Sequence, residues 1–476
     1  MSPGPRAPGP VLAAFGLLLA RLSSSSAVPD VPGFAALFGT KTRYQEVNPN
    51  PSADPSVLRP PPGERCVPVH VTAVVRHGTR YPTSRNIRRI LELSELLTGG
   101  RRDPGGAGGQ RDPGGAGGQR DPGEAGRLIR DRWECWYTED MDGQLVPQGR
   151  AELRQLARRL AALFPALLSE HNVRKRSVSF VTSSKHRCVS SVEAFQEGLH
   201  QHWGRHGAPD YAHRVDDELM RFFERCRGYV EGVETNRTAL LEVEKFRHGD
   251  EMEAVRRRVA EKLGVAPQRL TPDLVETAFF LCSYELSIRS VHSPWCLLFE
   301  ERDAQVLEFL SDLQQYWKRS HGHAITGLSS CPLFHHVFRT LDKAGRPRRS
   351  TDPPPEPASI LVGHGETLLP LLALLGLYKD QTPPTASNYH SQHGRQFRSS
   401  RIVPYAANLL LVLFDCQRGP RLQLLLNEAP VRFPGLAEDA PLYRDVRAAY
   451  RHLLDGCDSR TECEVRPGAR GPSTEL

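Results

Sequence analysis

Residues 76–82 read Arg-His-Gly-Thr-Arg-Tyr-Pro and place one imidazole between two guanidiniums, directly after an apolar run. A neutral imidazole is a nucleophile near pH 7, and a guanidinium binds phosphate oxygens in a bidentate manner. His77 is therefore the candidate nucleophile for attack on phosphorus, with Arg76 and Arg80 as candidate phosphate-binding groups. Arg-His-Gly alone is a weak signal in a chain of 476 residues, whereas the full segment, with Arg80 and Pro82 in register, is a strong one.

Two further polar segments carry residues suited to the same chemistry. Segment 183–188, Ser-Ser-Lys-His-Arg-Cys, offers Arg187 as a third phosphate-binding cation. Segment 363–366, Gly-His-Gly-Glu, offers His364 to stabilise the transferring phosphoryl group and Glu366 as the acid that protonates the leaving group. Outlying phosphates of a polyanionic substrate would meet three more candidate cations: Lys41, Arg43 and Lys185.

Together these residue types predict hydrolysis of a phosphomonoester through a covalent intermediate. His77 would attack phosphorus in line to give a phosphohistidine, Glu366 would protonate the leaving alkoxide, and water would then release phosphate. Because preorganised cations supply most of the stabilisation in phosphoryl transfer, no metal ion or other cofactor is expected. His200, His202 and His206 do not share one helical face, which argues against a metal site there.

The elements that must position these residues alternate between strands and helices. Apolar runs predict strands, three of them directly before the polar segments, at 67–75, 177–182, 359–362, 408–414 and 422–426. Helical spacing of apolar residues predicts helices over 150–168 and 367–377. Alternation of this kind indicates an α/β fold, with a largely parallel sheet sandwiched by helices. Ligands of such sheets bind beyond the carboxyl ends of the strands, so the three polar segments are expected to converge.

A helical pattern between residues 200 and 335 predicts an inserted α-helical cap domain. The α/β core is then expected in two parts, 35–199 and 336–465. Two stretches of the core are interpreted as exposed insertions without catalytic residues: a disordered Gly-rich tandem repeat at 102–126 and a loop rich in Pro and Arg at 345–358.

Segment 76–82 resembles the signature of the histidine acid phosphatases, a branch of the phosphoglycerate-mutase-like fold. The Gly-His-Gly-Glu element is similar to the distal His-Ala-Glu element of the multiple inositol polyphosphate phosphatase group, with Gly365 in the place of alanine. The resemblance extends over roughly residues 35–465 and includes four other segments: Phe-Gly-Thr-Lys-Thr-Arg-Tyr at 38–44, Ser-Ser-Lys-His-Arg-Cys at 183–188, Tyr-Trp-Lys-Arg at 316–319 and Ile-Val-Pro-Tyr at 402–405.

This resemblance implies a phytase-like phosphatase that acts on inositol hexakisphosphate and pentakisphosphate, and also on 2,3-bisphosphoglycerate. Three alternatives remain open: another histidine acid phosphatase, a phosphomutase of the same fold, and a catalytically inactive lumenal binding protein. A mutase would pass the phosphoryl group to an acceptor instead of water. The intact residues His77, Arg80, His364 and Glu366 argue against an inactive protein.

The charge balance fits an anionic ligand, since 62 Lys and Arg face 55 Asp and Glu for a formal net charge of +7. No stripe of interleaved basic and aromatic residues indicates binding of nucleic acid. No segment is long and apolar enough for an integral membrane helix. The expected partners are therefore small polyanionic phosphate esters.

Residues 1–27 have the features of a signal peptide: Arg6, an apolar run at 11–20, and small residues at the end. Residues 466–476 form a polar tail whose last four residues, Ser-Thr-Glu-Leu, resemble an endoplasmic reticulum retention signal. A retention receptor is therefore a candidate partner. The endoplasmic reticulum lumen is the expected location, with secretion of molecules that escape retention.

Entry into an oxidising compartment would favour disulfides among the ten cysteines. Three pairs are expected: Cys66–Cys416, Cys282–Cys296 and Cys457–Cys463. The chain has one Asn-x-Ser/Thr sequence in which x is not proline; it begins at Asn236 and predicts a glycan at a surface position.

Overall fold

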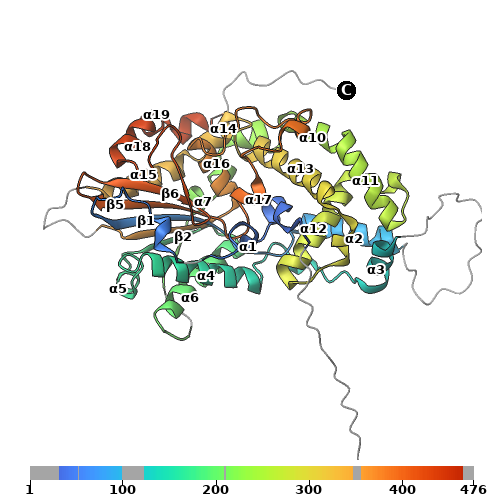
Figure 1. Ribbon diagram of the computed structural model, residues 1–476, viewed down its shortest axis with the longest axis horizontal. Helices are drawn as coiled ribbons and strands as arrows, with labels where there is room; N and C mark the ends of the chain where they lie inside the picture. The colour runs from blue at the N-terminus through green and yellow to red at the C-terminus, as the bar shows by residue number, and fades with distance from the viewer. Residues whose placement is uncertain are drawn as a thin grey trace, which may run out of the picture.

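The computed structural model describes residues 32–51, 53–98, 123–207, 209, 211–346 and 355–464. Outside these residues lie the predicted signal peptide (1–27), most of the repeat at 102–126, the middle of the loop at 345–358 and the tail at 466–476. Figure 1 shows two adjoining parts, one built on a sheet flanked by helices and the other built from helices alone.

Within the described ranges, seven strands form one sheet in the order β3-β2-β4-β1-β5-β6-β7. The strands are β1 (Cys66–Arg76), β2 (Ser179–Thr182), β3 (Arg214–Val215), β4 (Ala358–Gly363), β5 (Asn408–Cys416), β6 (Arg421–Leu426) and β7 (Ala429–Val431). The first four pair in parallel, and β6 runs with them because it is antiparallel to β5, itself antiparallel to β1. The largely parallel sheet predicted from the sequence is thereby confirmed.

Helices cover both faces of the sheet (Figure 1): α4 (Pro147–Leu163), α6 (His186–His202), α15 (Cys331–Ala344) and α16 (Gly365–Leu374). The side chains of β1 alternate between the two faces, as the period of a strand requires. Ala73 and Val75 belong to the hydrophobic core under α4 and α6, whereas Val74 belongs to the core under α15 and α16. The sheet is therefore buried on both sides, and its polar groups gather at its ends.

The helical part has a hydrophobic core of its own, with Phe279, Trp295 and Phe309 among its largest side chains. Its helices are α2 (Ser84–Thr98), α3 (Glu124–Arg132), α10 (Leu241–Arg247), α11 (Asp250–Leu263), α12 (Pro272–Arg289) and α13 (Glu301–Arg319). Helices α2 and α3 precede residue 200, yet they contribute to the same core as α11–α13. The division of the chain at residues 199 and 335 stays a prediction.

Shorter helices complete the fold: α1 (Tyr44–Val47), α5 (Glu170–Arg174), α7 (Asp217–Met220), α8 (Phe222–Arg225), α9 (Arg227–Tyr229), α14 (Ala324–Leu328), α17 (Ser399–Ile402), α18 (Tyr443–Ala449), α19 (Arg451–Gly456) and α20 (Ser459–Glu462). None of the helices in the described ranges has the length and hydropathy that a membrane span would need.

Four disulfides join described residues: Cys66–Cys416, Cys226–Cys463, Cys282–Cys296 and Cys331–Cys457. The predicted pairs Cys66–Cys416 and Cys282–Cys296 are confirmed. The predicted pair Cys457–Cys463 is wrong, because helix α20 lies between these two cysteines and each bonds to a distant segment instead. Two cysteines of the described chain are free thiols, Cys135 and Cys188.

Candidate active site

The three polar segments meet at the carboxyl ends of β1, β2 and β4, as the parallel sheet requires. His77 directly follows β1 and His364 directly follows β4, and the centroids of their rings lie 5.7 Å apart. The backbone N–H of His77 donates to the carbonyl of Gly363 at 2.9 Å, which fixes the two loops against each other. Ser183, which follows β2, lies with its Oγ 2.9 Å from His364 Nε2. Residues nearly 290 positions apart therefore share one site.

The ring of His77 is held in one tautomer. Its Nδ1 lies 2.8 Å from the carbonyl oxygen of Gly78, which only accepts hydrogen bonds, so Nδ1 carries the proton. The lone pair is then on Nε2. Burial lowers the pKa of His77 well below its usual value, and the charges of Arg187, Arg76 and Arg80 lower it further. His77 is therefore a neutral imidazole with one nitrogen free for nucleophilic attack.

The loop that follows His77 is packed too tightly for a side chain at Gly78. A Cβ at this position would lie 2.4 Å from the carbonyl oxygen of Gly149, at the start of α4. The next residue, Thr79, is clamped by a carboxylate of the same helix: its N–H and Oγ1 donate to Glu152 at 2.8 and 2.7 Å. Helix α4 thus positions the loop that carries the predicted nucleophile.

Three arginines surround the imidazole, and each has a buried Nε with no hydrogen-bond partner among the described residues: Arg76, Arg80 and Arg187. Arg76 is held through Nη1, which donates to the carbonyls of Thr40 and Val403, both at 2.6 Å. Arg80 donates to the carbonyl of Tyr81 at 2.7 Å. These partners are neutral, so the positive charges of Arg76 and Arg80 are oriented by the fold without being neutralised by it.

His364 is also neutral in its protein surroundings. Arg187 Nη2 lies 3.3 Å from its Nδ1, and a guanidinium can only donate, so Nδ1 accepts and Nε2–H faces Ser183. Burial lowers the pKa of His364 to about 3, with Arg187 as the largest charge effect in the same direction. Its expected donation to a phosphoryl oxygen therefore requires a bound anion that raises this pKa.

Glu366 lies on the first turn of α16 and is partly exposed. Its Oε1 lies 3.5 Å from Nη2 of Arg319, the last residue of α13. Burial raises the pKa of the carboxyl, but Arg319 and then His364 lower it, and the net value is well below the usual one. Arg319 is a residue of the site that the sequence reasoning left unassigned. Its signal was the segment Tyr-Trp-Lys-Arg at 316–319, which carried the resemblance without a role.

The three cations expected to meet outlying phosphates are placed differently. The Nζ of Lys41 lies 3.5 Å above the ring of Phe280, and burial followed by the charges of Arg80 and Arg76 lowers its pKa to about 7. Arg43 donates to Glu46, with Nε at 3.0 Å from the carboxylate. Lys185 is exposed beside the start of α6. Only the first of the three is brought to the arginines around His77.

Gly365 stands where the His-Ala-Glu element of the similar phosphatases has alanine. The fold nevertheless leaves room for a methyl group at this position. A Cβ at this position would meet Nε of Arg76 at 3.7 Å, which is an ordinary contact. The departure does not disturb the loop that carries Glu366, because the neighbouring His364 caps α16 through reciprocal hydrogen bonds with Thr367.

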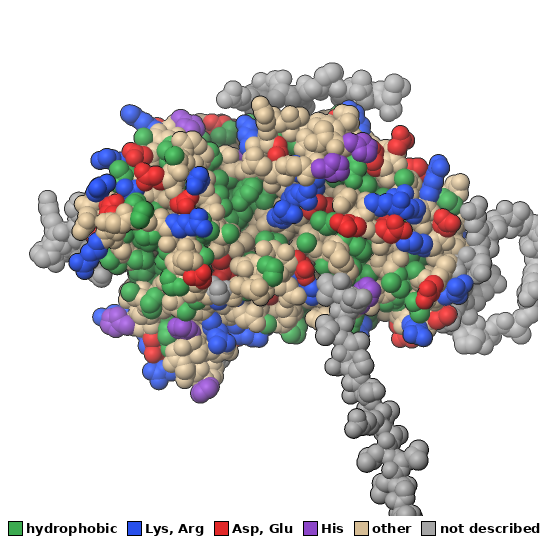
Figure 2. All heavy atoms as spheres, in the orientation of Figure 1, with side chains coloured by type: hydrophobic (Ala, Val, Ile, Leu, Met, Phe, Trp, Pro, Cys, Tyr) green, Lys and Arg blue, Asp and Glu red, His purple; other side chains and the backbone are tan. Residues whose placement is uncertain are grey.

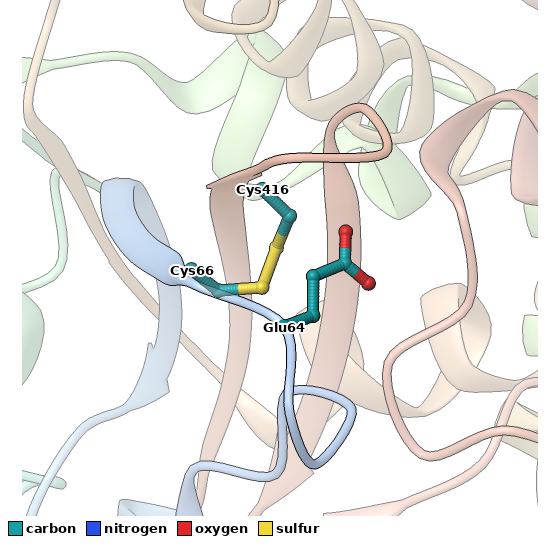
Figure 3. Close-up of side chains that lie close together, drawn as sticks. All are labelled: Glu64, Cys66 and Cys416. Atoms are coloured by element: carbon teal, nitrogen blue, oxygen red, sulfur yellow. A yellow bond between two sulfur atoms is a disulfide. The ribbon is translucent and has the colours of Figure 1, made fainter.

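One group of described residues has the ligand types of a metal site: Glu64, Cys66 and Cys416 (Figure 3). The two sulfurs are bonded to each other in a disulfide and offer no thiolate. The carboxylate of Glu64 is already occupied, since it accepts from the N–H of Arg418 at 2.8 Å and from Nε of Arg421 at 3.2 Å. These residues therefore do not fit a metal ion.

The outer surface differs from the site in its charge pattern. On the face drawn in Figure 2, Lys and Arg side chains are interspersed with Asp and Glu. Around His77, by contrast, the largest charge effects on the imidazole come from three arginines, and Glu366 is a carboxylate that acts on all three of them. The arrangement can bind a phosphate dianion, present it to a neutral imidazole and stabilise negative charge on phosphorus.

Comparison with known proteins agrees with this chemistry. The family model of the histidine phosphatase superfamily (branch 2) matches residues 69–427. Human multiple inositol polyphosphate phosphatase 1 is 43% identical over 504 aligned residues, which cover 98% of this chain and 99% of the human protein.

Solved structures share the fold. The phytase from D. castellii has a TM-score of 0.70 at 15% identity, over 90% of this chain and 87% of the phytase. The multiple inositol polyphosphate phosphatase of Bifidobacterium longum, solved in complex with inositol hexasulfate, has a TM-score of 0.63 at 13% identity, over 84% of this chain and 93% of the bacterial one. The predicted α/β fold is confirmed.

Proposed function

This chain belongs to branch 2 of the histidine phosphatase superfamily and, within it, to the multiple inositol polyphosphate phosphatases. From that premise we propose that it hydrolyses the phosphomonoesters of inositol polyphosphates, inositol hexakisphosphate and pentakisphosphate among them. The reaction passes through a phosphohistidine on His77.

The observation that carries this proposal is the set of three buried guanidinium Nε donors, on Arg76, Arg80 and Arg187, that have no acceptor among the described residues. A buried donor without a partner is costly, and such groups in native proteins call for a functional reason. All three act on the imidazole of His77. A phosphate group has enough acceptor oxygens to satisfy them together, and it would bring its phosphorus to the nucleophile.

The first chemical step forms one bond and breaks one bond. Nε2 of His77 uses its lone pair to attack phosphorus, while the bond from phosphorus to the ester oxygen breaks and Glu366 gives its proton to that oxygen. The Nδ1 proton stays on the ring and donates to the carbonyl of Gly78, 2.8 Å away, which stabilises the positive charge of the phosphorylated imidazole. A water molecule then attacks phosphorus, its proton passes to Glu366, and neutral His77 is restored.

Glu366 must carry a proton to begin this cycle, and its pKa is lowered by Arg319 and His364. A substrate phosphate bound at the arginines adds negative charge beside the carboxylate and competes for Arg319, and both effects raise that pKa. Binding of the substrate therefore favours the protonated form of Glu366 that the first step needs. The ion pair of 3.5 Å between Glu366 and Arg319 is loose enough to be exchanged for a phosphate contact.

A substrate with several phosphates is supported by the cations beyond the reacting group. Lys41 and Arg319 both interact electrostatically with Glu366, from opposite parts of the chain. The relatives of this chain are named for inositol polyphosphates, and the bacterial neighbour was solved with an inositol hexasulfate. A ring that carries many phosphates would engage these outer cations while one phosphate reacts.

The proposed location is the endoplasmic reticulum lumen, with secretion as the alternative. Four disulfides support an oxidising compartment, because cysteine side chains are kept as reduced thiols in the cytosol. Asn236 is partly exposed, and its side chain accepts hydrogen bonds from Thr238, within the same Asn-x-Thr sequence. A glycan at Asn236 is proposed on that basis.

Acid quenching of the enzyme with labelled inositol hexakisphosphate, followed by mapping of the label, tests the proposal. We expect label on His77, release of inorganic phosphate, and a loss of kcat by at least about four orders of magnitude in His77→Ala. His248→Ala is the matched control, because this histidine is exposed and pairs only with Glu244 of its own helical segment. Transfer of phosphate to a second alcohol instead of water would indicate a mutase, and the absence of turnover would indicate a binding protein.

A further inference from the structure

Tyr405 has a buried hydroxyl that the described protein does not satisfy. The residue is 0% exposed, and its Oη has no hydrogen-bond partner among the described residues. Several other buried tyrosines of the described chain have partners; Tyr450, for example, donates to the carbonyl of Leu375 at 2.8 Å. A phenylalanine would fill the same space without a desolvated hydroxyl, so the oxygen of Tyr405 requires a reason.

The side chain of Tyr405 lies among the residues that bind phosphate in the proposed function. Its ring centroid is 6.4 Å from that of His77, and the guanidinium of Arg76 lies 4.8 Å above the ring. Burial lowers the pKa of Arg76 to about 10, and the largest charge effect that opposes burial comes from Tyr405. Tyr405 is likewise the largest charge effect raising the pKa of Arg80. The ring of Tyr405 therefore lies against Arg76 and interacts electrostatically with Arg80.

The backbone around Tyr405 is hydrogen-bonded to the segments that carry Thr42 and His77. Its N–H donates to the carbonyl of Thr42 at 3.0 Å, and the N–H of Ala406 donates to the carbonyl of His77 at 3.1 Å. Ala406 has a φ of 57°, in the left-handed region that a residue with a Cβ rarely adopts. Strain of this kind persists where the surrounding structure fixes a functional geometry. The position of Tyr405 relative to His77 is thus specified by the chain on both sides.

We propose that Tyr405 is a further catalytic residue whose hydroxyl donates a hydrogen bond to a nonbridging oxygen of the phosphoryl group that His77 receives. This inference rests on the proposed function. It completes a set of donors with Arg76, Arg80 and Arg187, which have unpartnered Nε atoms in the same place. Burial raises the pKa of the Tyr405 phenol despite the opposing charges of Arg80 and Arg76, so the hydroxyl keeps the proton that it must donate.

Replacement by phenylalanine tests the hydroxyl alone. In Tyr405→Phe we expect kcat/KM for inositol hexakisphosphate to fall between about tenfold and a hundredfold, the effect of a lost hydrogen bond to a charged group. The inhibition constant for inorganic phosphate should weaken in the same variant. The melting temperature should stay equal or rise, because an unsatisfied buried hydroxyl is removed. Tyr450→Phe is the matched control: it should lower the melting temperature and leave kcat/KM unchanged.

The outcomes separate this inference from the function on which it rests. If wild-type protein forms no phosphohistidine at His77, the proposed function fails. If wild-type protein forms it and Tyr405→Phe keeps wild-type kcat/KM, the catalytic role of Tyr405 is overturned. A loss of activity with a fall in melting temperature similar to that of Tyr450→Phe would also overturn it, since the hydroxyl would then be structural.

Discussion

Two arginine clusters of this protein differ in whether carboxylates neutralise their positive charge. We name the group of Arg76, Arg80 and Arg187 the phosphate cluster, and the group of Glu308, Asp312 and Arg395 the α13 cluster. In the α13 cluster Arg395 is fully paired: Nε and Nη2 both donate to Asp312, at 2.8 and 2.6 Å, and Nη2 also donates to Glu308 at 2.9 Å. In the phosphate cluster the guanidiniums donate to neutral groups and keep an unpartnered Nε.

The difference fits the role that we propose for the phosphate cluster. A buried cation beside two carboxylates is neutralised in place, and it joins α13 to the segment that leads into β5. A buried cation held by carbonyl groups keeps its charge, so it attracts an anion from outside. The comparison between the two clusters yields predictions, because the same substitution should have opposite consequences in each.

The largest effect is expected in the α13 cluster. Arg395→Met would leave Asp312, at 0% exposure, without its cation, and would leave Glu308, at 1% exposure, with Arg398 alone, whose Nη1 lies 3.3 Å away. Removal of one partner from such a group costs about 3–5 kcal/mol of unfolding free energy. Urea denaturation would measure this loss, with Arg432→Met as the control, since that arginine is 64% exposed and pairs only at the surface. A loss below about 1 kcal/mol would show that the α13 cluster is not a structural joint.

The second prediction applies the same change to the phosphate cluster. Arg187→Met removes a guanidinium whose Nη2 contacts neutral His364, so no buried carboxylate loses a partner. We expect kcat/KM for inositol hexakisphosphate to fall by about a hundredfold or more, the cost of one preorganised donor in charge stabilisation. The free energy of unfolding should stay within about 0.5 kcal/mol of wild type or increase. Destabilisation comparable to that of Arg395→Met would erase the distinction between the clusters.

The phosphate cluster was easier to predict from the sequence than the α13 cluster. Arg76, His77 and Arg80 lie on one loop, and the parallel sheet dictates that His364 and Arg187 follow neighbouring strands to the same edge. A local pattern and one topological rule were therefore enough for the convergence of these residues.

The remaining parts depend on tertiary packing, so a sequence motif alone did not give these residues a role. Arg319 enters the site from the end of a helix in the helical part, about 240 residues from His77. Tyr405 is held beside His77 by backbone hydrogen bonds from Tyr405 to Thr42 and from Ala406 to His77. The one wrong disulfide pair has the same origin: Cys457 and Cys463 are close in sequence, but a helical turn separates them and their partners come from distant segments.

The smallest expected effect is a change in the pH dependence of stability, and it concerns Glu152, whose carboxylate holds the loop that follows His77. Its hydrogen-bond partners are the uncharged N–H and Oγ1 of Thr79, in contrast to the carboxylates of the α13 cluster, which share an arginine. Burial raises its pKa from 4.5 to about 7, although the bonds from Thr79 oppose the shift. The folded protein therefore holds this proton more tightly than the unfolded chain does. The resulting stabilisation is complete below about pH 4.5 and is lost as the pH rises through about 7.

Glu152→Gln would remove this dependence, because a neutral amide reproduces the protonated acid and can pair with both groups of Thr79. Between pH 5 and pH 8, the unfolding free energy of wild type should fall relative to the variant by roughly 2–3 kcal/mol. Denaturation curves at the two pH values, compared as a difference between the two proteins, cancel the contributions of all other titrating groups. Parallel behaviour of the two proteins would mean that Glu152 stays ionised under the loop. In that case the arginines of the phosphate cluster would already have a carboxylate nearby as a counter-charge. They would then differ from Arg395 only in how far their charge is neutralised.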